Sequence, residues 1–259
     1  MKELSLDERK IVLLEILKKF HEICEKNNLT YYLSGGTLLG AIRHKGFIPW
    51  DDDVDIWMPI ADLEKLNTLT FDGYYYWDCA KDTKYPLTYG RFQKNGTLVK
   101  EGVCSFSSIE LGINIDVFAL YDGEKSKIES INKEYHKLSR NYRLKSYIAI
   151  KGENPIKNVI KTILHFSKFY VNFNDNALRL RNLCKKYISD NYDCVFSYDE
   201  YAKRIFDKDY FMKRIKCKFE NLELYIPNGY HEILTIMYGD YMTPPKNKDS
   251  KHRTRSFIL

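Results

Sequence analysis

The sequence has no closely paired cysteines. Its six cysteines are scattered, without a C-x-x-C spacing, at Cys24, Cys79, Cys104, Cys184, Cys194 and Cys217. Zinc knuckles and disulfide frameworks need regularly spaced cysteines, so this scatter argues against both. Isolated thiols are typical of a reducing compartment, where disulfide bonds are rare.

Long apolar runs are also missing near the N-terminus. The opening stretch MKELSLDERK is too charged for a secretory signal peptide, and the apolar run Ile11–Leu14 is four residues long. A helix that spans a membrane needs about 20 apolar residues. We therefore expect a cytoplasmic protein without a membrane-spanning helix.

Common phosphate-binding and zinc-binding motifs do not match. The chain lacks the phosphate-loop pattern G-x-x-x-x-G-K-[ST] and the G-x-G-x-x-G spacing of dinucleotide-binding folds. His231-Glu232 begins like the zinc motif H-E-x-x-H, but Thr235 stands where the second histidine belongs. The sequence therefore does not predict those three classes of site.

Positive charge is concentrated in two segments. The formal net charge is +6, and the range 124–168 alone has eleven Lys or Arg against four Glu, a local charge of +7. The range 246–255 adds five basic residues against one Asp. Each segment is either a solvated face or a surface for an anionic substrate, a membrane or nucleic acid.

The spacing of apolar residues predicts a mixture of helices and strands. Ser5 and Glu8 form a capping-box pattern before an amphipathic helix over 6–26. Further helices are predicted over 37–43, 60–69 and 230–238, with several helical segments between 123 and 190. Strands are predicted over 29–33, 74–79, 87–93, 97–99, 113–118 and 216–227.

Acidic residues follow a glycine turn in the range 31–59. The turn is Ser34-Gly35-Gly36, and on a strand Asp53 and Asp55 point to one face because side chains alternate. Two like charges on a half-buried strand repel and are costly to desolvate, which a divalent cation relieves. A later strand pattern carries Asp116 alone among apolar residues, which predicts a third ligand.

Such an arrangement of carboxylates is suited to phosphoryl transfer. The three Asp side chains offer hard oxygen ligands for one or two Mg²⁺, or for Mn²⁺. The spacing favours an α+β, nucleotidyltransferase-like fold, with a mixed β-sheet flanked by helices and a helical insertion. We expect a catalytic core over 1–123, a basic helical insertion over 124–192, and a segment over 193–259 that returns to the core.

One stretch closely resembles a known family. The residues Leu33–Asp55 read LSGGTLLGAIRHKGFIPWDDDVD. Two further blocks agree, Arg91-Phe92 with Asn95–Thr97 and the C-terminal Tyr238–Pro245 with His252 beyond. This pattern resembles the LicD family of bacterial phosphocholine transferases, which are related to the fukutin group that transfers ribitol phosphate. The resemblance covers both ends of the chain and leaves 124–215 without a recognised motif.

The resemblance implies transfer of phosphocholine from CDP-choline, or from a similar CDP-alcohol, to a hydroxyl group. The acceptor would be a cell-surface glycan precursor, free or lipid-linked: a teichoic acid, a capsule or a lipopolysaccharide. Asp53, Asp55 and Asp116 would be the catalytic metal ligands, and Asp116 would also accept the proton of the acceptor hydroxyl. No nucleic-acid partner is expected, and the basic range 124–168 is a hypothesised contact with the inner face of the membrane.

Residues around the acidic cluster would bind the donor. Asp51 either shares the side of Asp53 and Asp55 or supports them from outside, while Asp52 points away. The glycine turn would face the diphosphate of the donor. The positive side chain of Arg43 or Lys45 would offset the charge of the diphosphate. The candidate substrate-binding residues are Ser34, Gly35, Gly36, Arg43, Lys45, Asp51, Arg91 and His252.

Several alternatives remain at this point. A quaternary ammonium is held by aromatic rings, and Trp50 and Tyr74–Trp77 are candidates, although aromatic residues on strands more often pack in the core. The group transferred could instead be ribitol phosphate, glycerol phosphate or a nucleotidyl group. A nucleotidyltransferase-like domain that only binds or scaffolds is a further alternative, which the three aspartates disfavour.

Overall fold

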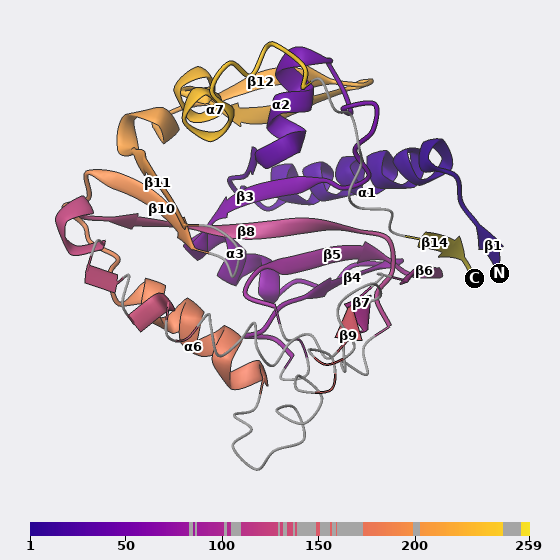
Figure 1. The fold of residues 1–259 in the computed structure, drawn as a ribbon, viewed down its shortest axis with the longest axis horizontal. Helices are drawn as coiled ribbons and strands as arrows, with labels where there is room; N and C mark the ends of the chain where they lie inside the picture. The colour runs from indigo at the N-terminus through magenta and orange to yellow at the C-terminus, as the bar shows by residue number, and fades with distance from the viewer. Residues whose placement is uncertain are drawn as a thin grey trace.

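A computed structural model describes residues 1–82, 85, 87–100, 103–104, 110–128, 130–131, 134–136, 138, 149–150, 156, 159, 173–198, 203–245 and 255–259. A mixed β-sheet with helices around it forms the centre of the molecule (Figure 1). This confirms the predicted fold class. In the described part of the chain, no helix is both long and apolar enough to cross a membrane.

Helix α1 (Leu6–Lys26) begins where the capping box predicts. The Glu8 backbone N–H donates to Ser5 Oγ at 3.2 Å, and the Ser5 N–H donates to the Glu8 carboxylate at 2.9 Å. These reciprocal bonds satisfy donors that a helix start otherwise leaves unpaired. One side of α1 is buried through Leu13, Ile16, Leu17, Phe20 and Cys24.

The predicted glycine turn is itself the start of a helix. Strand β2 (Tyr32–Leu33) leads into α2 (Gly35–Arg43), which begins before the predicted start at Thr37. Gly35 has a φ of +53°, a left-handed conformation that glycine adopts without steric cost. The chain therefore passes from β2 into α2 through Ser34 alone, without a separate loop.

The acidic residues lie on a loop and at the start of a strand. Strand β3 (Asp55–Pro59) begins at Asp55 and runs directly into α3 (Ile60–Asn67). Asp53 stands in the preceding loop, so the expectation that it lies on the strand is wrong. It is exposed there, whereas Val54 beside it is buried. The predicted strand therefore carries one of the paired carboxylates and the loop carries the other.

Seven strands form the central sheet. Its order is β11-β10-β8-β3-β2, and β5 pairs with β8 while β4 pairs with β5. The remaining bounds are β4 (Tyr74–Trp77), β5 (Gly90–Lys94), β8 (Asn114–Gly123), β10 (Cys194–Tyr198) and β11 (Lys203–Asp207). β3 and β8 are parallel and the other pairs are antiparallel, so the sheet is mixed.

The two faces of β8 differ in character. Ile115 and Val117 are fully buried, and Phe92, the register partner of Ile115, packs edge-on against Phe20 of α1. The alternate residues Asp116 and Phe118 are only partly buried. One face therefore belongs to the core under α1, and the other is accessible to a ligand.

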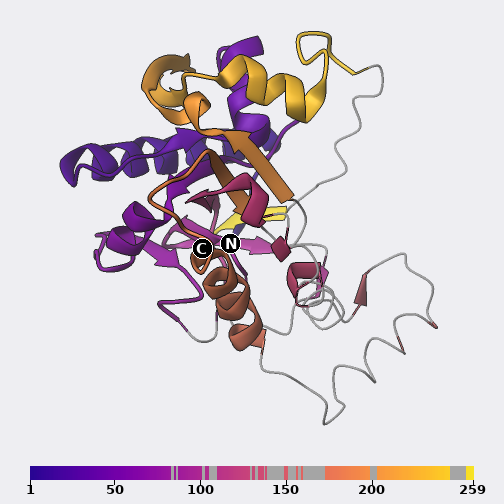
Figure 2. The same ribbon diagram turned by 90° about the vertical axis from the view of Figure 1, so that its left-hand side faces the viewer.

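The segments over the upper end of the sheet come from distant parts of the sequence. α2, α7 (Tyr230–Tyr238) and a hairpin of β12 (Arg214–Phe219) and β13 (Leu222–Pro227) gather there, and Figure 2 shows the same grouping from the side. The predicted strand 216–227 is therefore two strands, which turn at Glu220 with a φ of +53°. A 3₁₀ helix, η1 (Lys208–Phe211), leads into this hairpin.

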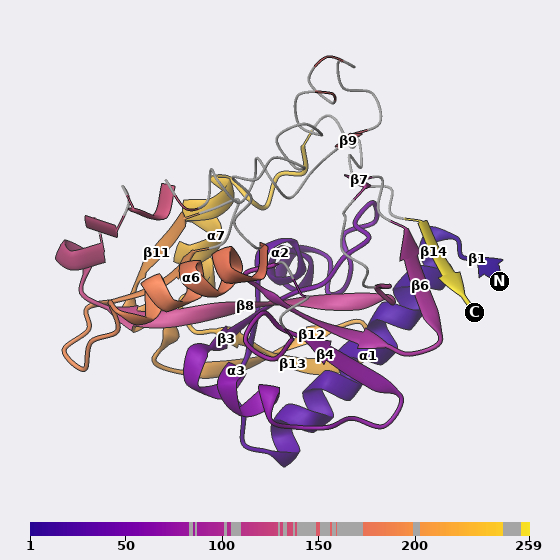
Figure 3. The ribbon, with the colours of Figure 1, turned by 90° about the horizontal axis from the view of Figure 1, so that it is seen from below.

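The two ends of the chain pair in a small separate sheet. β14 (Arg255–Ile258), which was not predicted, lies between β1 (Lys2–Glu3) and β6 (Thr97–Lys100). Figure 3 shows these strands together beside the end of α1. The C-terminal strand thus returns to the N-terminal region.

The predicted division into core, insertion and returning segment stays a prediction. Much of 124–192 lies outside the described residues, but α6 (Phe173–Lys185) is described, and its Arg181 binds Asp78 and the Thr88 carbonyl oxygen. The short strands β7 (Val103–Cys104) and β9 (Ala149–Ile150) pair with each other. The range predicted to be helical therefore includes a strand.

Candidate active site

Four side chains form a row across the accessible face of the sheet. Asp55 on β3 is the register partner of Asp116 on β8. Asp116 is also the partner of Arg91 on β5, which is in turn the partner of Trp77 on β4. Register partners point to the same face, and neighbouring strands are about 4.8 Å apart. Residues separated by up to 61 positions are thereby brought together.

Arg91 and Asn114 fix the position of Asp116. Arg91 Nε donates to Asp116 Oδ1 at 3.1 Å, and Asn114 Nδ2 donates to the same oxygen at 2.7 Å. Arg91 is 6% exposed, so this ion pair is largely shielded from water. Arg91 also contacts Tyr89, with its Nη2 at 3.4 Å from the hydroxyl. The predicted substrate-binding Arg91 is therefore bound to a catalytic candidate.

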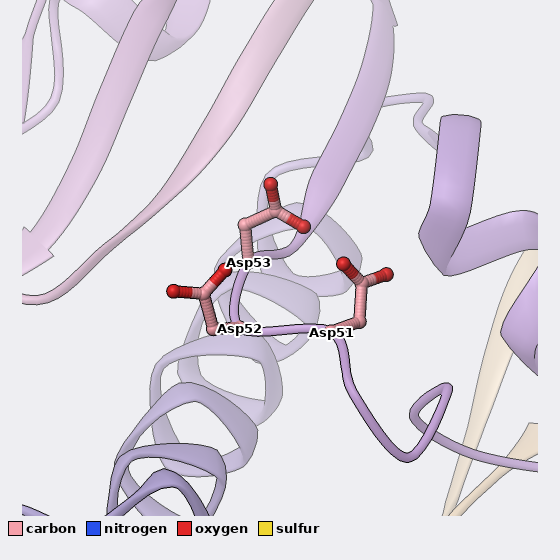
Figure 4. Close-up of side chains that lie close together, drawn as sticks. All are labelled: Asp51, Asp52 and Asp53. Carbon is pink, nitrogen blue, oxygen red and sulfur yellow. The ribbon is translucent and has the colours of Figure 1, made fainter. Parts of the chain in front are cut away.

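The loop before β3 brings three carboxylates together. Asp51, Asp52 and Asp53 each offer an oxygen atom, and these atoms all lie within 4.8 Å of one another. In Figure 4, the Asp51 and Asp52 carboxylates lie on the same side of the stretch of loop that joins them, with the Asp53 carboxylate above and between them. Asp52 is buried and Asp53 is exposed. The loop thus presents a concentrated negative charge beside Asp55.

The carboxylates influence one another strongly. Burial and then the charge of Asp53 raise the pKa of Asp51 to about 7. Burial and the charges of Asp53 and Asp116 raise the pKa of Asp55 well above its ordinary value. A divalent cation would remove this mutual repulsion, and carboxylate oxygens are the ligands that Mg²⁺ prefers. The residues present therefore fit a magnesium or manganese ion.

The two glycines allow α2 to reach the carboxylates. A Cβ atom on Gly35 would lie 2.6 Å from Asp55 Oδ2, and one on Gly36 would lie 2.7 Å from Asp51 Oδ2. The Ser34 N–H donates to the Asp55 carbonyl oxygen at 3.0 Å, and the Asp55 N–H donates to Thr37 Oγ1 at 2.9 Å. The start of α2, where backbone N–H groups favour anions, is thus bonded to the acidic strand.

The other predicted substrate-binding residues lie at varying places around α2. Ser34 is buried at the N-cap of α2, without a hydrogen bond from its side chain to the helix. Arg43 Nη1 donates to the Tyr241 carbonyl oxygen at 2.8 Å, which ties α2 to the C-terminal segment. Lys45 is exposed, and its carbonyl oxygen accepts the Glu220 N–H of the hairpin at 2.7 Å. His252 lies outside the described residues.

Arg204 on β11 is a site residue that the sequence analysis missed. Phe206 is two positions after Arg204, and its ring centroid lies 5.4 Å from that of Trp57. Trp57 is likewise two positions after Asp55. Because side chains alternate, Arg204 faces the same side of the sheet as Asp55. Its positive charge also opposes the upward shift of the Asp55 pKa. No motif marks Arg204, and only the fold brings it to the site.

Tyr238 is a second site residue, after Arg204, to which the sequence analysis assigned no role. It ends α7, and Arg204 Nη1 contacts the sulfur of the preceding Met237 at 3.1 Å. Tyr238 is 43% exposed, and the partial desolvation of its ring, opposed by the charge of Arg204 and joined by that of Asp55, raises its pKa to about 12. Tyr238 is the first residue of the C-terminal block Tyr238–Pro245. The family resemblance therefore included Tyr238, but the sequence alone assigned it no role in the site.

The aromatic candidates divide between the two faces of the sheet. Tyr76 is fully buried, and the partly buried Tyr74 stacks on Phe92 with ring centroids 5.3 Å apart, so both lie on the core face of the sheet. Tyr75 and Trp77 point to the opposite face and contact each other, with ring centroids 4.5 Å apart. Trp50 is partly buried and lies edge-on to His44 at 6.3 Å.

The mixed sheet, the paired aspartates on β3 and β8 and the Gly-Gly helix start together define a nucleotidyltransferase-like domain. The family described as LicD/FKTN/FKRP, nucleotidyltransferase domain, matches residues 28–147. The chain is 32% identical over 275 aligned positions to the lipopolysaccharide cholinephosphotransferase LicD of Haemophilus influenzae, with all of both chains covered. The chain belongs to the LicD family.

Shorter similarities reach further relatives. The ribitol 5-phosphate transferase FKRP of human and of mouse is 46% identical over 47 residues, which cover 18% of this chain and 10% of FKRP. An uncharacterised protein of Rickettsia typhi is 47% identical over 57 residues, covering 22% of this chain and 18% of its own. These matches support the family, and they span small parts of the longer proteins.

Proposed function

We propose that this protein transfers phosphocholine from CDP-choline to a hydroxyl group of a cell-surface glycan precursor. The observation that carries the proposal is the row of Asp55, Asp116 and Arg91 beside the start of α2. The full-length similarity to a lipopolysaccharide cholinephosphotransferase supports phosphocholine as the group and a glycan as the acceptor. The acceptor is lipopolysaccharide, a teichoic acid or a capsule precursor.

The carboxylates would hold one or two Mg²⁺, with Mn²⁺ as a substitute. Asp53, Asp55 and Asp116 are the proposed ligands, and Asp51 adds negative charge beside them. A bound divalent ion neutralises phosphate oxygens and polarises the phosphorus atom. The chain's own contribution is to hold these carboxylates in place before substrate arrives, through Arg91 and the start of α2.

Donor binding is assigned to groups that surround the carboxylates. Backbone N–H groups at the start of α2 face the diphosphate of the donor, because a helix start favours anions. Arg204 binds a phosphate oxygen from the opposite side, and Tyr238 donates a hydrogen bond beside it. Asp116, oriented by Arg91 and Asn114, takes the proton from the acceptor hydroxyl as the new phosphate ester forms, while the diphosphate bond of the donor breaks and CMP leaves.

The aromatic residues support choline recognition. Trp77 stands at the end of the row that contains Asp116, with Tyr75 next to it. A quaternary ammonium cannot donate hydrogen bonds, and it is held by the faces of such rings. We assign Trp77 and Tyr75, rather than the core residues Tyr74 and Tyr76, to the ammonium end of the donor.

A second candidate keeps the site but changes the group transferred. The similarity to the ribitol 5-phosphate transferase FKRP favours ribitol phosphate, from the corresponding CDP-alcohol, as the main rival. Glycerol phosphate, nucleotidyl transfer and a non-catalytic module are further rivals. The shared carboxylates serve all the catalytic rivals, so the donor must be determined by experiment.

The donor is tested by incubating the purified protein with CDP-choline, CDP-ribitol or a nucleoside triphosphate, in the presence of Mg²⁺ and a glycan acceptor. CMP release from CDP-choline supports the proposal, whereas pyrophosphate release from a triphosphate contradicts it. The Asp53→Asn/Asp55→Asn variant should lose turnover but remain folded, and Asp72→Asn, which alters an exposed aspartate outside the site, should keep it. Full turnover by the double variant would overturn the metal assignment.

The basic range 124–168 lies mostly outside the described residues. We propose that it contacts the inner face of the cell membrane or an anionic lipid-linked acceptor there. Binding to vesicles that contain anionic lipid should weaken at high salt and after reversal of these charges. Binding that neither change affects would contradict this contact.

A further inference from the structure

Arg9 of α1 lies buried between the acidic loop and the C-terminal strand. Its Nε donates a hydrogen bond to the Asp52 carbonyl oxygen at 2.7 Å, and its Nη1 donates to Ser256 Oγ of β14. Arg9 is 7% exposed and Ser256 is 1% exposed. A charge buried to this degree is costly unless its donors are used, so these bonds fix the guanidinium in one place.

The next residue strengthens the same attachment. Lys10 Nζ donates to the Ile48 carbonyl oxygen at 3.1 Å and to the Pro49 carbonyl oxygen at 2.8 Å. Two consecutive residues of α1 thus hold three backbone carbonyls of the segment 48–52. This segment leads directly into Asp53 and β3.

Ser256 gives Arg9 a rigid support. It lies on β14, the middle strand of the sheet β1-β14-β6, and is the register partner of Val99. Its carbonyl oxygen accepts the Leu4 N–H at 2.8 Å. Figure 3 shows β14 and β1 beside the end of α1, near the two chain ends. The backbone around Ser256 is therefore bonded on both sides.

Asp52 directly precedes Asp53, one of the proposed metal ligands. The Asp52 carbonyl belongs to the peptide that joins Asp52 to Asp53, so rotation of this peptide would move the Asp53 carboxylate. A displacement of about 1 Å at a reacting centre can cost ~100-fold in rate. The hydrogen bond from Arg9 Nε to the Asp52 carbonyl oxygen opposes that rotation.

We propose that Arg9, held by Ser256, is a positioning residue that fixes the acidic loop and thereby sets its affinity for a divalent cation. The effect on cation affinity rests on the proposed function, which places a metal ion at the carboxylates. The positioning of the loop by Arg9 does not depend on it. The C-terminal strand becomes part of the active-site framework, although it carries no proposed catalytic residue. Arg9 of helix α1 links this strand to the acidic loop.

The test compares Ser256→Ala and Arg9→Lys with Glu3→Gln as the matched control. Glu3 lies in the same small sheet, and its carboxylate accepts hydrogen bonds from Nε and Nη2 of Arg255, each at 2.7 Å. The control therefore weakens that sheet without altering a partner of Arg9 in these bonds. Two readouts are needed: amide hydrogen exchange of residues 48–54 in the full-length, metal-free protein, and Mn²⁺ affinity measured by electron paramagnetic resonance.

In Ser256→Ala and in Arg9→Lys, the backbone amides of residues 48–54 should exchange about tenfold faster than in the control. Both variants should also bind Mn²⁺ about tenfold more weakly than the control. Each factor is what loss of a hydrogen bond to a buried charge implies. Exchange and affinity equal to those of Glu3→Gln would overturn the inference. If the unaltered protein binds no Mn²⁺, the proposed function fails, and hydrogen exchange alone decides whether Arg9 positions the loop. If Arg9→Lys does not fold, Ser256→Ala decides it.

Discussion

Gly35 and Asp55 approach so closely that a Cβ atom on Gly35 would lie 2.6 Å from Asp55 Oδ2. The same glycine has a φ of +53°. Two independent reasons therefore exclude a side chain here: the backbone conformation and the space taken by a carboxylate. The glycine of the family motif is explained by the approach of a helix to an acidic strand.

Gly35→Ala should reduce turnover by about 100-fold, because Asp55 must move to make room for the methyl group. Backbone strain alone would add about 1–2 kcal/mol of destabilisation. Gly73→Ala separates the two effects, since Gly73 has a φ of +74° but nothing within 4 Å of an added Cβ atom. Kinetic constants and urea denaturation should be measured on both variants. Equal losses of turnover in the two would show that strain, and not contact with Asp55, is responsible.

Local patterns predicted the parts of the fold that depend on neighbours in sequence. The capping box at Ser5 and the amphipathic spacing gave the bounds of α1, and the alternation around Asp116 indicated β8. These features need only the periodicity of one element. The residues of the acidic loop were identified in the same way, although Asp53 proved to precede the strand.

Other features depend on contacts between distant segments. β14 was not predicted, because its partners β1 and β6 lie far away in the sequence. Arg204 has no motif around it, and its side of the sheet follows from the register of β11 with β10 and of β10 with β8 and from the contact of Phe206 with Trp57. The role of Arg9 required the same kind of information.

Arg91→Met should lower turnover without abolishing folding, because Asp116 would lose its partner at 3.1 Å and with it a fixed orientation. We expect a decrease of about 10-fold to 100-fold, from loss of a hydrogen bond between charged groups. The double variant Arg91→Met/Asp116→Asn should be no worse than Asp116→Asn alone, because the two residues act together. Additive losses in this double-mutant cycle would contradict a positioning role for Arg91.

Arg181→Met should destabilise the fold strongly. Arg181 and Asp78 form an ion pair at 3% and 0% side-chain exposure, which joins α6 to the sheet. Removing one partner of such a pair leaves an uncompensated buried charge and costs about 3–5 kcal/mol. Lys185→Met on the same helix is the control, since its pair with Glu64 is 39% and 49% exposed and should contribute less than about 1 kcal/mol. Urea denaturation measures both, and equal changes in the free energy of unfolding would contradict the prediction.

Arg204→Met should raise the KM for CDP-choline by about 10-fold or more, because a charge-assisted hydrogen bond to phosphate would be lost. Arg204→Lys should recover only part of the affinity, since an ammonium group keeps the charge but not the planar, two-pronged geometry of a guanidinium. Arg179→Met removes a positive charge from an exposed position on α6 and controls for the change in net charge. Steady-state kinetics at fixed Mg²⁺ and salt give KM and kcat for all three variants. A KM for Arg204→Met within twofold of that of Arg179→Met would exclude Arg204 from donor binding and leave it only its influence on the charge of Asp55.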